Sequence, residues 1–303
     1  PQAISVITAE QMRDQNAQSL QEALRYSAGV RTDQYGLDNR GDWFALRGGS
    51  SGTTLLNGMR LPLVGWWGVV REEPYAFERV EVLHGPSSVM AGQNAPGGVV
   101  NLVSKRPQAV ASREISLQAG NNDHRQLAAD LTGPLSDTLS YRLIALWRDN
   151  DTQVDYADNQ RRYIAPSIAW RPTESLQFIA YAEYQKDRNR NTEGFFPWAG
   201  TLLPAPNGPI PLERFVGEPD WDVNMGERTR AGYEFEYKFN DNWSLRHDLR
   251  HDRVRGRIRT MYAAFWEVDA QGNGYGDNAL GEDRTITRLA YGNDDRARIS
   301  NGD

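Results

Sequence analysis

The sequence has 303 residues, with 34 Lys and Arg against 40 Asp and Glu, and its formal charge is −6. This mildly acidic balance argues against a nucleic-acid-binding protein, which normally shows a basic patch. No cysteine is present, which excludes zinc-thiolate sites, redox pairs and disulfides. The longest wholly apolar run, residues 61–70, is too short for a membrane-spanning helix. The chain also lacks a starting Met and a signal peptide, so we expect a processed chain or a piece of a longer one.

The first 110 residues are Gly-rich and irregular, and we predict that they form a compact α+β domain. Two helix starts show the capping-box pattern, in which a hydroxyl residue is followed three positions later by Gln or Glu. These starts are Thr8 with Gln11 and Ser19 with Glu22. Short apolar runs between Gly-rich turns predict strands at residues 44–47, 54–56 and 79–83.

From residue 111 to residue 303 the sequence changes to antiparallel strands with period-two alternation. In the clearest of them, residues 228–239, alanine and aromatic residues alternate with charged residues. The strands are long enough to cross a bilayer at a tilt. The eight predicted strands are residues 113–119, 125–132, 139–148, 161–171, 176–187, 227–239, 243–257 and 284–299.

The connections between these strands favour an outer-membrane barrel. After the first two, long and short connections alternate, so that the long ones gather at one end of the sheet. Barrels of this kind have tight periplasmic turns and longer extracellular loops. The predicted connections are residues 120–124, 133–138, 149–160, 172–175, 188–226, 240–242 and 258–283.

Eight strands are too few for a barrel that encloses a separate domain, because an eight-stranded barrel is filled by its own side chains. A barrel with a plugged lumen has about 22 strands and needs on the order of 525 residues at the spacing seen here. We therefore expect residues 111–303 to be the N-terminal part of a transmembrane β-barrel.

The segment ERVEVLHGPSSVMAGQNAPGGVVNLVSKRP, residues 78–107, resembles the signature of the plug domain of TonB-dependent outer-membrane receptors, most closely the siderophore receptors. Three further stretches follow the expected order: PQAISVITAEQM from Pro1, LQEALRYSAGV from Leu20, and FALRGG with TLLNGMRL between Phe44 and Leu61. Later, EFEYKFNDNWSLRHDLR and TRLAY resemble barrel segments of the hydroxamate-siderophore branch.

The resemblance implies a plug inside a barrel in the Gram-negative outer membrane, and a transport receptor instead of an enzyme. A ferric siderophore, of the hydroxamate or ferrichrome type, would bind between the plug and the extracellular loops. Because the ligand would arrive as a preformed Fe(III) chelate, no resident cofactor and no protein metal ligand is expected. The TonB–ExbB–ExbD energy-transducing complex would pair by strand addition with a peptide upstream of Pro1.

Two positions depart from the family pattern. His84 stands where the family commonly has Arg or Lys before Gly-Pro, so a charge pairing of this position with the barrel wall is not carried over. Met90-Ala91-Gly92 stands where the family commonly has Leu-Tyr-Gly, which removes an aromatic ring from the plug interior.

Five plug residues are predicted ligand contacts. Arg47 matches the plug position that points toward ligand in the hydroxamate receptors, and a guanidinium can donate hydrogen bonds to hydroxamate oxygens. The alternative for Arg47 is a salt bridge within the plug. Gly65, Trp66 and Trp67 are expected in an apical loop, where the rings face the ligand or pack on the barrel wall. Tyr75 is expected in the next apical turn.

The long connection at residues 188–226 holds six of the chain's 15 prolines, which lower the entropy lost when a loop becomes ordered. Its aromatic side chains would either form a binding lip or pack on one another. These predicted ligand contacts are Phe195, Phe196, Trp198 and Trp221. Of the 34 basic residues, 31 are Arg, and we expect most of them in bidentate ion pairs between the wall and the plug.

Three other functions fit parts of the sequence. The same architecture could import haem, cobalamin or an oligosaccharide, although none of the four His residues lies in a predicted plug apex. The chain could also belong to a non-transporting receptor. This would be an adhesin, a phage docking surface, or a signalling receptor with a further domain before Pro1. A soluble β-sandwich enzyme is disfavoured because Asp, His and Ser residues occur without a convergent spacing.

Overall fold

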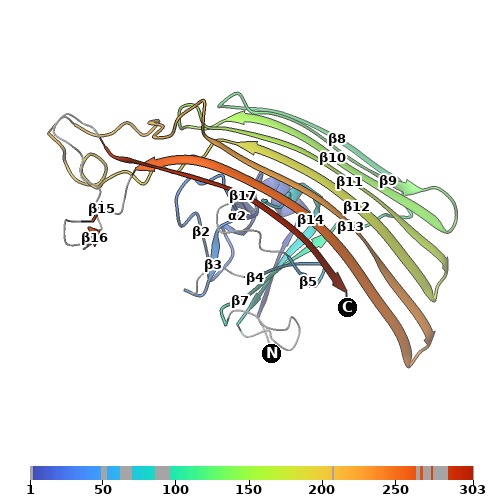
Figure 1. The fold of residues 1–303 in the computed structure, drawn as a ribbon. Helices are drawn as coiled ribbons and strands as arrows, with labels where there is room; N and C mark the ends of the chain where they lie inside the picture. The colour runs from blue at the N-terminus through green and yellow to red at the C-terminus, as the bar shows by residue number, and fades with distance from the viewer. Residues whose placement is uncertain are drawn as a thin grey trace.

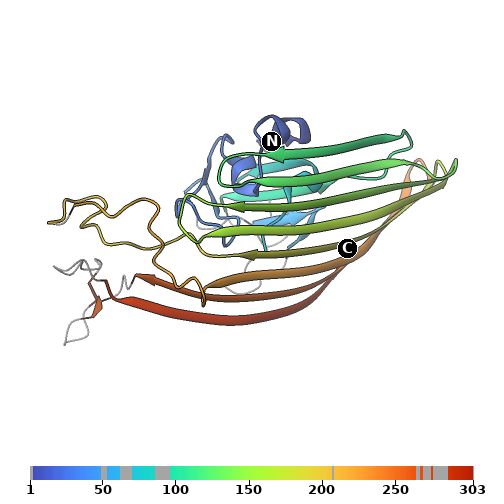
Figure 2. The ribbon, with the colours of Figure 1, turned by 90° about the horizontal axis from the view of Figure 1, so that it is seen from above.

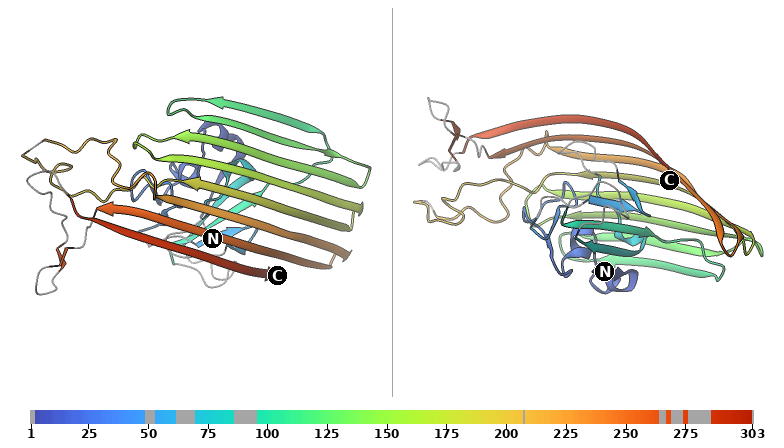
Figure 3. Two further views of the ribbon diagram at one scale, coloured as in Figure 1. Left: turned by 45° about the horizontal axis from the view of Figure 1, so that its top comes forward. Right: turned by 90° about the horizontal axis from the view of Figure 1, so that it is seen from below.

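The computed structural model describes residues 3–48, 53–61, 70–85, 96–206, 208–263, 267–268, 274–275 and 286–302. A small N-terminal unit, called the plug here (residues 3–106), lies on the concave side of a long curved sheet (Figure 1). The further views place the plug on that same side of the sheet (Figure 3). Within the described ranges, no helix is both long and apolar enough to cross a membrane.

Both predicted helix starts of the plug are confirmed. Helix α1 (Ala9–Asp14) begins after Thr8, whose side chain accepts a hydrogen bond from the Gln11 amide. Helix α2 (Leu20–Leu24) begins after Ser19, whose side chain accepts from the Glu22 amide. In each case the hydroxyl satisfies an amide that has no partner inside the first helical turn.

Five strands form the plug sheet in the order β1-β6-β7-β4-β5. The short β4 runs parallel to β7, and the other neighbouring pairs are antiparallel. A separate pair, β2 with β3, lies beside it. The strand bounds are β1 (Ile4–Thr8), β2 (Val30–Thr32), β3 (Phe44–Leu46), β4 (Thr53–Leu56), β5 (Met59–Arg60), β6 (Phe77–His84) and β7 (Gly98–Ser104), and the 3-10 helix η1 (Pro74–Ala76) precedes β6.

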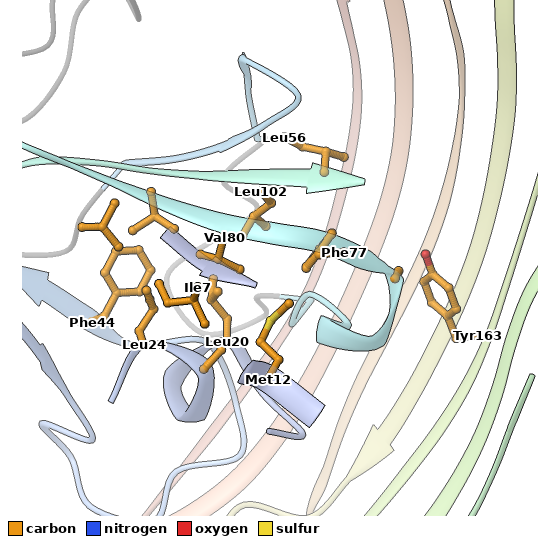
Figure 4. Close-up of a cluster of buried hydrophobic side chains, with 14 of the residues drawn as sticks. Ile7, Met12, Leu20, Leu24, Phe44, Leu56, Phe77, Val80, Leu102 and Tyr163 are labelled. Atoms are coloured by element: carbon orange, nitrogen blue, oxygen red, sulfur yellow. The ribbon is translucent and has the colours of Figure 1, made fainter. Parts of the chain in front are cut away.

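The plug core packs apolar residues of both helices on one face of this sheet (Figure 4). Leu20 and Leu24 of α2 are at most 1% exposed and meet Val80 of β6 in the same cluster. Gly98 allows β6 and β7 to approach closely, because its φ is +131° and an added Cβ would lie 2.1 Å from the Leu83 carbonyl oxygen.

The large sheet has eight antiparallel strands, and each is hydrogen-bonded to its neighbour in the order β8-β9-β10-β11-β12-β13-β14-β17 (Figure 2). The bounds are β8 (Ser112–Ala119), β9 (Arg125–Pro134), β10 (Leu139–Asp151), β11 (Asp158–Thr173), β12 (Leu176–Asn189), β13 (Val223–Asn240), β14 (Trp243–Ala263) and β17 (Arg288–Gly302). Two short strands, β15 (Glu267–Val268) and β16 (Gly274–Tyr275), pair between β14 and β17.

All eight predicted strands are present, and most extend beyond the predicted ends, which shortens the connections. Tight turns occupy residues 135–138, 174–175 and 241–242. The connections at residues 120–124, 152–157 and 190–222 lie at the opposite end, called the loop end here, and 24 residues separate β14 from β17 at that end. The alternation of short and long connections is therefore confirmed.

The two faces of the large sheet differ in the polarity of their side chains. In β10, Tyr141, Leu143 and Trp147 point away from the plug, whereas Arg142 and Arg148 are buried toward it. The same inner face also carries apolar side chains that join the plug core, namely Ala128, Ile144, Leu146 and Tyr163. The inner face is therefore polar in general, but apolar where it contacts the plug.

Strand β14 has one buried and one exposed row of side chains. Its even-numbered residues from 250 to 260 are buried on the plug side, whereas its odd-numbered residues from 243 to 259 are exposed. The outward row carries Leu245 and Leu249 near the tight turn and arginines from Arg253 onward, toward the loop end. The outward row therefore changes from apolar to charged side chains toward the loop end.

Candidate functional site

The interface between the plug and the inner face of the sheet contains a buried ion-pair network. Its centre is the pair Glu72 and Glu73, which are 6% and 1% exposed. They precede η1, in which the Glu73 carboxylate accepts a hydrogen bond from the Tyr75 amide at 3.2 Å. The two neighbouring carboxylates therefore project from one fixed segment of the plug and contact different strands of the large sheet.

Glu73 joins the plug to β10 and β11. Arg161 donates to Glu73 Oε2 at 2.8 Å and also binds Asp187 of β12. Arg148 approaches the same carboxylate at 3.3 and 3.4 Å. Burial alone would raise the pKa of Glu73, but the two guanidiniums outweigh burial and hold it below its ordinary value.

Glu72 joins the plug to the next strands along the sheet. Arg228 of β13 binds it in a bidentate pair, at 2.6 Å to Oε1 and 3.0 Å to Oε2. Arg230 lies 3.5 Å from Oε1 and also donates to Asp252 of β14 at 2.6 Å. Planar guanidiniums suit such forked contacts. Glu72 and Glu73 thus bind arginines of β10, β11 and β13. Two of these arginines also bind carboxylates of β12 and β14.

Arginines of the large eight-stranded sheet, called the wall here, also bind carbonyl oxygens of the plug backbone. Arg250, which is fully buried, donates to the carbonyls of Leu56, Met59 and Arg60 in the β4–β5 hairpin. Each of these bonds satisfies a backbone acceptor that has left water. Similar bonds run from Arg142 to Arg106, from Arg148 to Gln18, and from Arg161 to Glu72.

Toward the loop end, plug residues 37–43 meet the wall and the long loop. The Asn39 side-chain amide donates to Asn159 Oδ1 at 2.8 Å and to the Arg190 carbonyl at 2.7 Å. The Thr192 hydroxyl donates to the Leu37 carbonyl. A polar cavity of about 250 Å³ lies beside this junction, lined by plug residues such as Asp33 and Arg71 and by wall residues.

Asp42 links this junction to the ion-pair network. Its carboxylate accepts hydrogen bonds from the Leu20 amide at 3.2 Å and from the Glu72 amide at 2.8 Å. Burial raises the pKa of Asp42 to about 6, although Arg71 opposes this shift. The start of α2 and the start of the network are therefore tied to one carboxyl group.

The structure describes two of the five predicted plug contacts. Arg47 is exposed, has a φ of +49°, and lies against Gly29 and Gly85 and beside His84 of β6. Tyr75 lies in η1 against the wall, not in an open apical turn, because its hydroxyl donates to Glu114 of β8 at 3.0 Å.

The three remaining plug contacts, Gly65, Trp66 and Trp67, lie outside the described residues. Ligand contact by any of the five plug residues stays a prediction.

The four predicted loop aromatics occupy different surroundings at the loop end. Phe195 packs edge-on against Tyr262, with ring centroids 5.6 Å apart. Phe196 lines a cavity of about 480 Å³ formed mainly by apolar residues of the same loop. Trp198 is 56% exposed, and the Arg259 guanidinium lies 5.8 Å above the ring of Trp221. Their contact with ligand stays a prediction.

Sequence reasoning anticipated the arginine network but not its plug partners. The excess of Arg over Lys was the signal for wall-to-plug pairs. The acidic pair at residues 72–73 carried no such signal, because adjacent acidic residues are common on solvated surfaces. Their partners Arg161 and Arg228 are remote in sequence and come together only through the strand register.

Comparison with known proteins agrees with this architecture. Residues 1–99 match the family model of the TonB-dependent receptor plug domain. The ferrioxamine B receptor of Salmonella typhimurium strain SL1344 is 34% identical over 274 residues, which cover 88% of this chain and 39% of the relative. The ferrichrome outer membrane transporter and phage receptor of Escherichia coli K12 is 35% identical over 269 residues, with 86% and 36% coverage.

Solved structures show the same fold. The open form of the ferric-catecholate import receptor of E. coli K12 gives a TM-score of 0.84 at 24% identity, covering 99% of this chain and 45% of that one. The ferripyoverdine receptor of Pseudomonas aeruginosa gives a TM-score of 0.82 at 19% identity, with 96% and 37% coverage. This chain thus spans about two fifths of the length of the curated relatives that it matches.

Proposed function

Since this chain carries the plug domain and adjoining barrel strands of the TonB-dependent outer-membrane receptors, we propose that it serves the energy-coupled uptake of a ferric siderophore of the hydroxamate type. The curated relatives are named as receptors and transporters of ferrioxamine and ferrichrome. Both compounds hold Fe(III) through hydroxamate oxygens. The chelate is the cargo, and it needs no metal ligand from the protein.

The observation that carries the proposal is the seating of the plug. Buried ion pairs from Glu72 and Glu73 hold it on the inner face of the sheet, while plug residues 37–43 meet the aromatic loop at the loop end. A chelate arriving from that end would reach the plug and the loop together. This arrangement suits a receptor that binds its cargo on top of a plug.

In this proposal the chelate is bound by exposed and partly exposed aromatic residues of the loop and by residues of the plug. Phe196 and Trp198 offer apolar and ring surface to the organic shell of a chelate. Arg47, Gly65, Trp66, Trp67 and Tyr75 are the proposed plug side, and Phe195 and Trp221 complete the loop side. The partner in transport is the TonB–ExbB–ExbD complex, which supplies the energy.

Binding of a panel of ferric chelates to the full-length receptor in detergent tests the proposal. We expect ferrioxamine B or ferrichrome to bind, and a ferric catecholate and haem to bind at least about 10-fold more weakly, as measured by isothermal titration calorimetry. Trp198→Ala is expected to weaken binding about 10-fold, in the range of an aromatic contact residue.

The matched control is Trp243→Ala, because Trp243 is 72% exposed beside the tight turn at the opposite end of the sheet. It is expected to leave the affinity unchanged. Failure of every iron chelate to bind the unaltered receptor would refute the siderophore proposal.

A further inference from the structure

A cluster of three charged side chains joins the plug to the long loop. The Arg40 guanidinium binds Asp38 through two hydrogen bonds, from Nε to Oδ1 at 2.9 Å and from Nη2 to Oδ2 at 2.6 Å. The same guanidinium lies 3.2 Å from Glu193 Oε1, measured from Nε. The side chains of all three residues are at most 3% exposed. Two buried carboxyl groups, one from the plug and one from the loop, therefore face one cation.

Glu193 is a weaker partner of Arg40 than Asp38 is. Within the part of the chain that the structure describes, neither of its carboxyl oxygens has a hydrogen-bond partner. Burial raises the pKa of Glu193 to about 8, and Asp38 and Asp222 add to the shift while Arg40 opposes it. An ionised carboxylate here is poorly compensated, whereas a protonated one removes the repulsion from Asp38.

Glu193 also precedes the aromatic part of the loop. The carbonyl of Gly194 accepts a hydrogen bond from the Ala263 amide at the end of β14, at 3.0 Å. Phe195 then packs on Tyr262 of the same strand. On the plug side, Thr192 and Asn39 add the hydrogen bonds described above. Displacement of Glu193 would therefore loosen the segment that carries the aromatic residues.

We propose that Glu193, Arg40 and Asp38 form a proton-dependent latch, in which a protonated Glu193 holds residues 192–198 of the loop against the plug. Loss of that proton favours release of the loop. Glu193 is thus a positioning residue for the loop aromatics. Only the role of those aromatics in ligand binding rests on the function proposed above, and the latch itself does not.

The direction of the pH dependence follows from the two states of Glu193. In the released loop its pKa returns toward the ordinary value of 4.5, whereas in the docked loop it is about 8. The docked state binds the proton more tightly, so docking is strongest below about pH 4.5 and weakens as the pH rises to about 8. Within this window the equilibrium constant for docking of the loop changes by at most tenfold for each pH unit.

Hydrogen exchange of the Ala263 amide in the full-length receptor measures this equilibrium, because the amide is released when Gly194 moves away. After correction for the intrinsic exchange rate, we expect its protection to fall by up to about tenfold per pH unit between pH 4.5 and 8. The experiment is carried out without siderophore.

Glu193→Gln keeps the shape of the side chain but removes the proton, so it should abolish this slope. Asp38→Asn removes the competing anion and should shift the end of the slope to lower pH. The matched control is Glu213→Gln, because Glu213 is an exposed acid of the same loop, and it should leave the slope intact.

An unaltered receptor without the slope, or a slope that persists in Glu193→Gln, would overturn the latch. Either result leaves the siderophore proposal standing, because no siderophore is present in the assay. Conversely, a receptor that binds no ferric chelate can still show the slope.

Discussion

The carboxylate of Glu73 is almost completely enclosed at the interface between the plug and the sheet. Its side chain is 1% exposed and faces Arg148 and Arg161. Taking these groups out of water is costly, and the mutual attraction offsets that cost only while all of them are present. Removal of Glu73 alone is therefore strongly destabilising, because it leaves buried guanidinium charge without compensation.

We expect Glu73→Gln to lower the free energy of unfolding of the plug by about 3–5 kcal/mol, since the buried Arg148 loses its carboxylate partner and the buried Arg161 keeps only Asp187. Chemical denaturation of the full-length receptor in detergent measures this change. The control is Glu236→Gln, whose partner Arg246 is 74% exposed. An exposed pair of this kind contributes less than about 1 kcal/mol, and equal effects of the two variants would contradict the buried network.

At the scale of elements, the β4–β5 hairpin depends on a residue of the wall. Arg250 of β14 binds three of its carbonyl oxygens, and Asp252 holds the guanidinium in place through Nε at 2.8 Å. The hairpin is short and lies at the edge of the plug sheet. Arg250 therefore adds an anchor from outside the plug to the pairing of β4 with β7 inside it.

Arg250→Gln is expected to increase hydrogen exchange at the hairpin amides, such as that of Leu61, by about 10-fold or more. The reason is that loss of hydrogen bonds to a charged donor costs about 1.5–3 kcal/mol. Exchange in β1, which lies at the opposite edge of the plug sheet from the hairpin, should stay unchanged. A uniform increase across the whole plug would indicate global destabilisation instead of a local anchor.

The elements were predictable from sequence because their causes are local. Alternation of side chains sets the two faces of a strand such as β13, and a hydroxyl such as that of Thr8 marks a helix start. The network was not predictable in detail, because Glu72 finds Arg228 only after the strands have been placed beside one another in register. Tyr75 shows the same limit, since its partner Glu114 lies in the first wall strand.

At the scale of the whole molecule, the plug and the sheet form one continuous interior. The plug core extends into the wall through Ile144, Leu146 and Tyr163, and the same strands, β10 and β11, carry the ion-pairing residues Arg148 and Arg161. Separation of the two parts would expose both the apolar surface and the buried charges. The stability of the assembly should therefore follow the ionisation of the acidic residues at the interface.

Acid is expected to weaken the seating of the plug. Because the pKa of Glu73 is below its ordinary value of 4.5, the stability it provides is complete above about pH 4.5 and is lost as the pH falls through its lowered pKa. Scanning calorimetry of the full-length receptor from pH 6 to pH 3 should show a falling plug transition. Glu73→Gln should reduce that dependence, and an identical pH profile in the variant would contradict this origin.

The bonds from Arg250 to the β4–β5 hairpin engage the main chain, and every residue type carries the same carbonyl group. Replacing the exposed side chain of Arg60 would therefore leave this attachment in place. The attachment therefore tolerates replacement of an exposed hairpin side chain such as that of Arg60, whereas it depends on the guanidinium of Arg250.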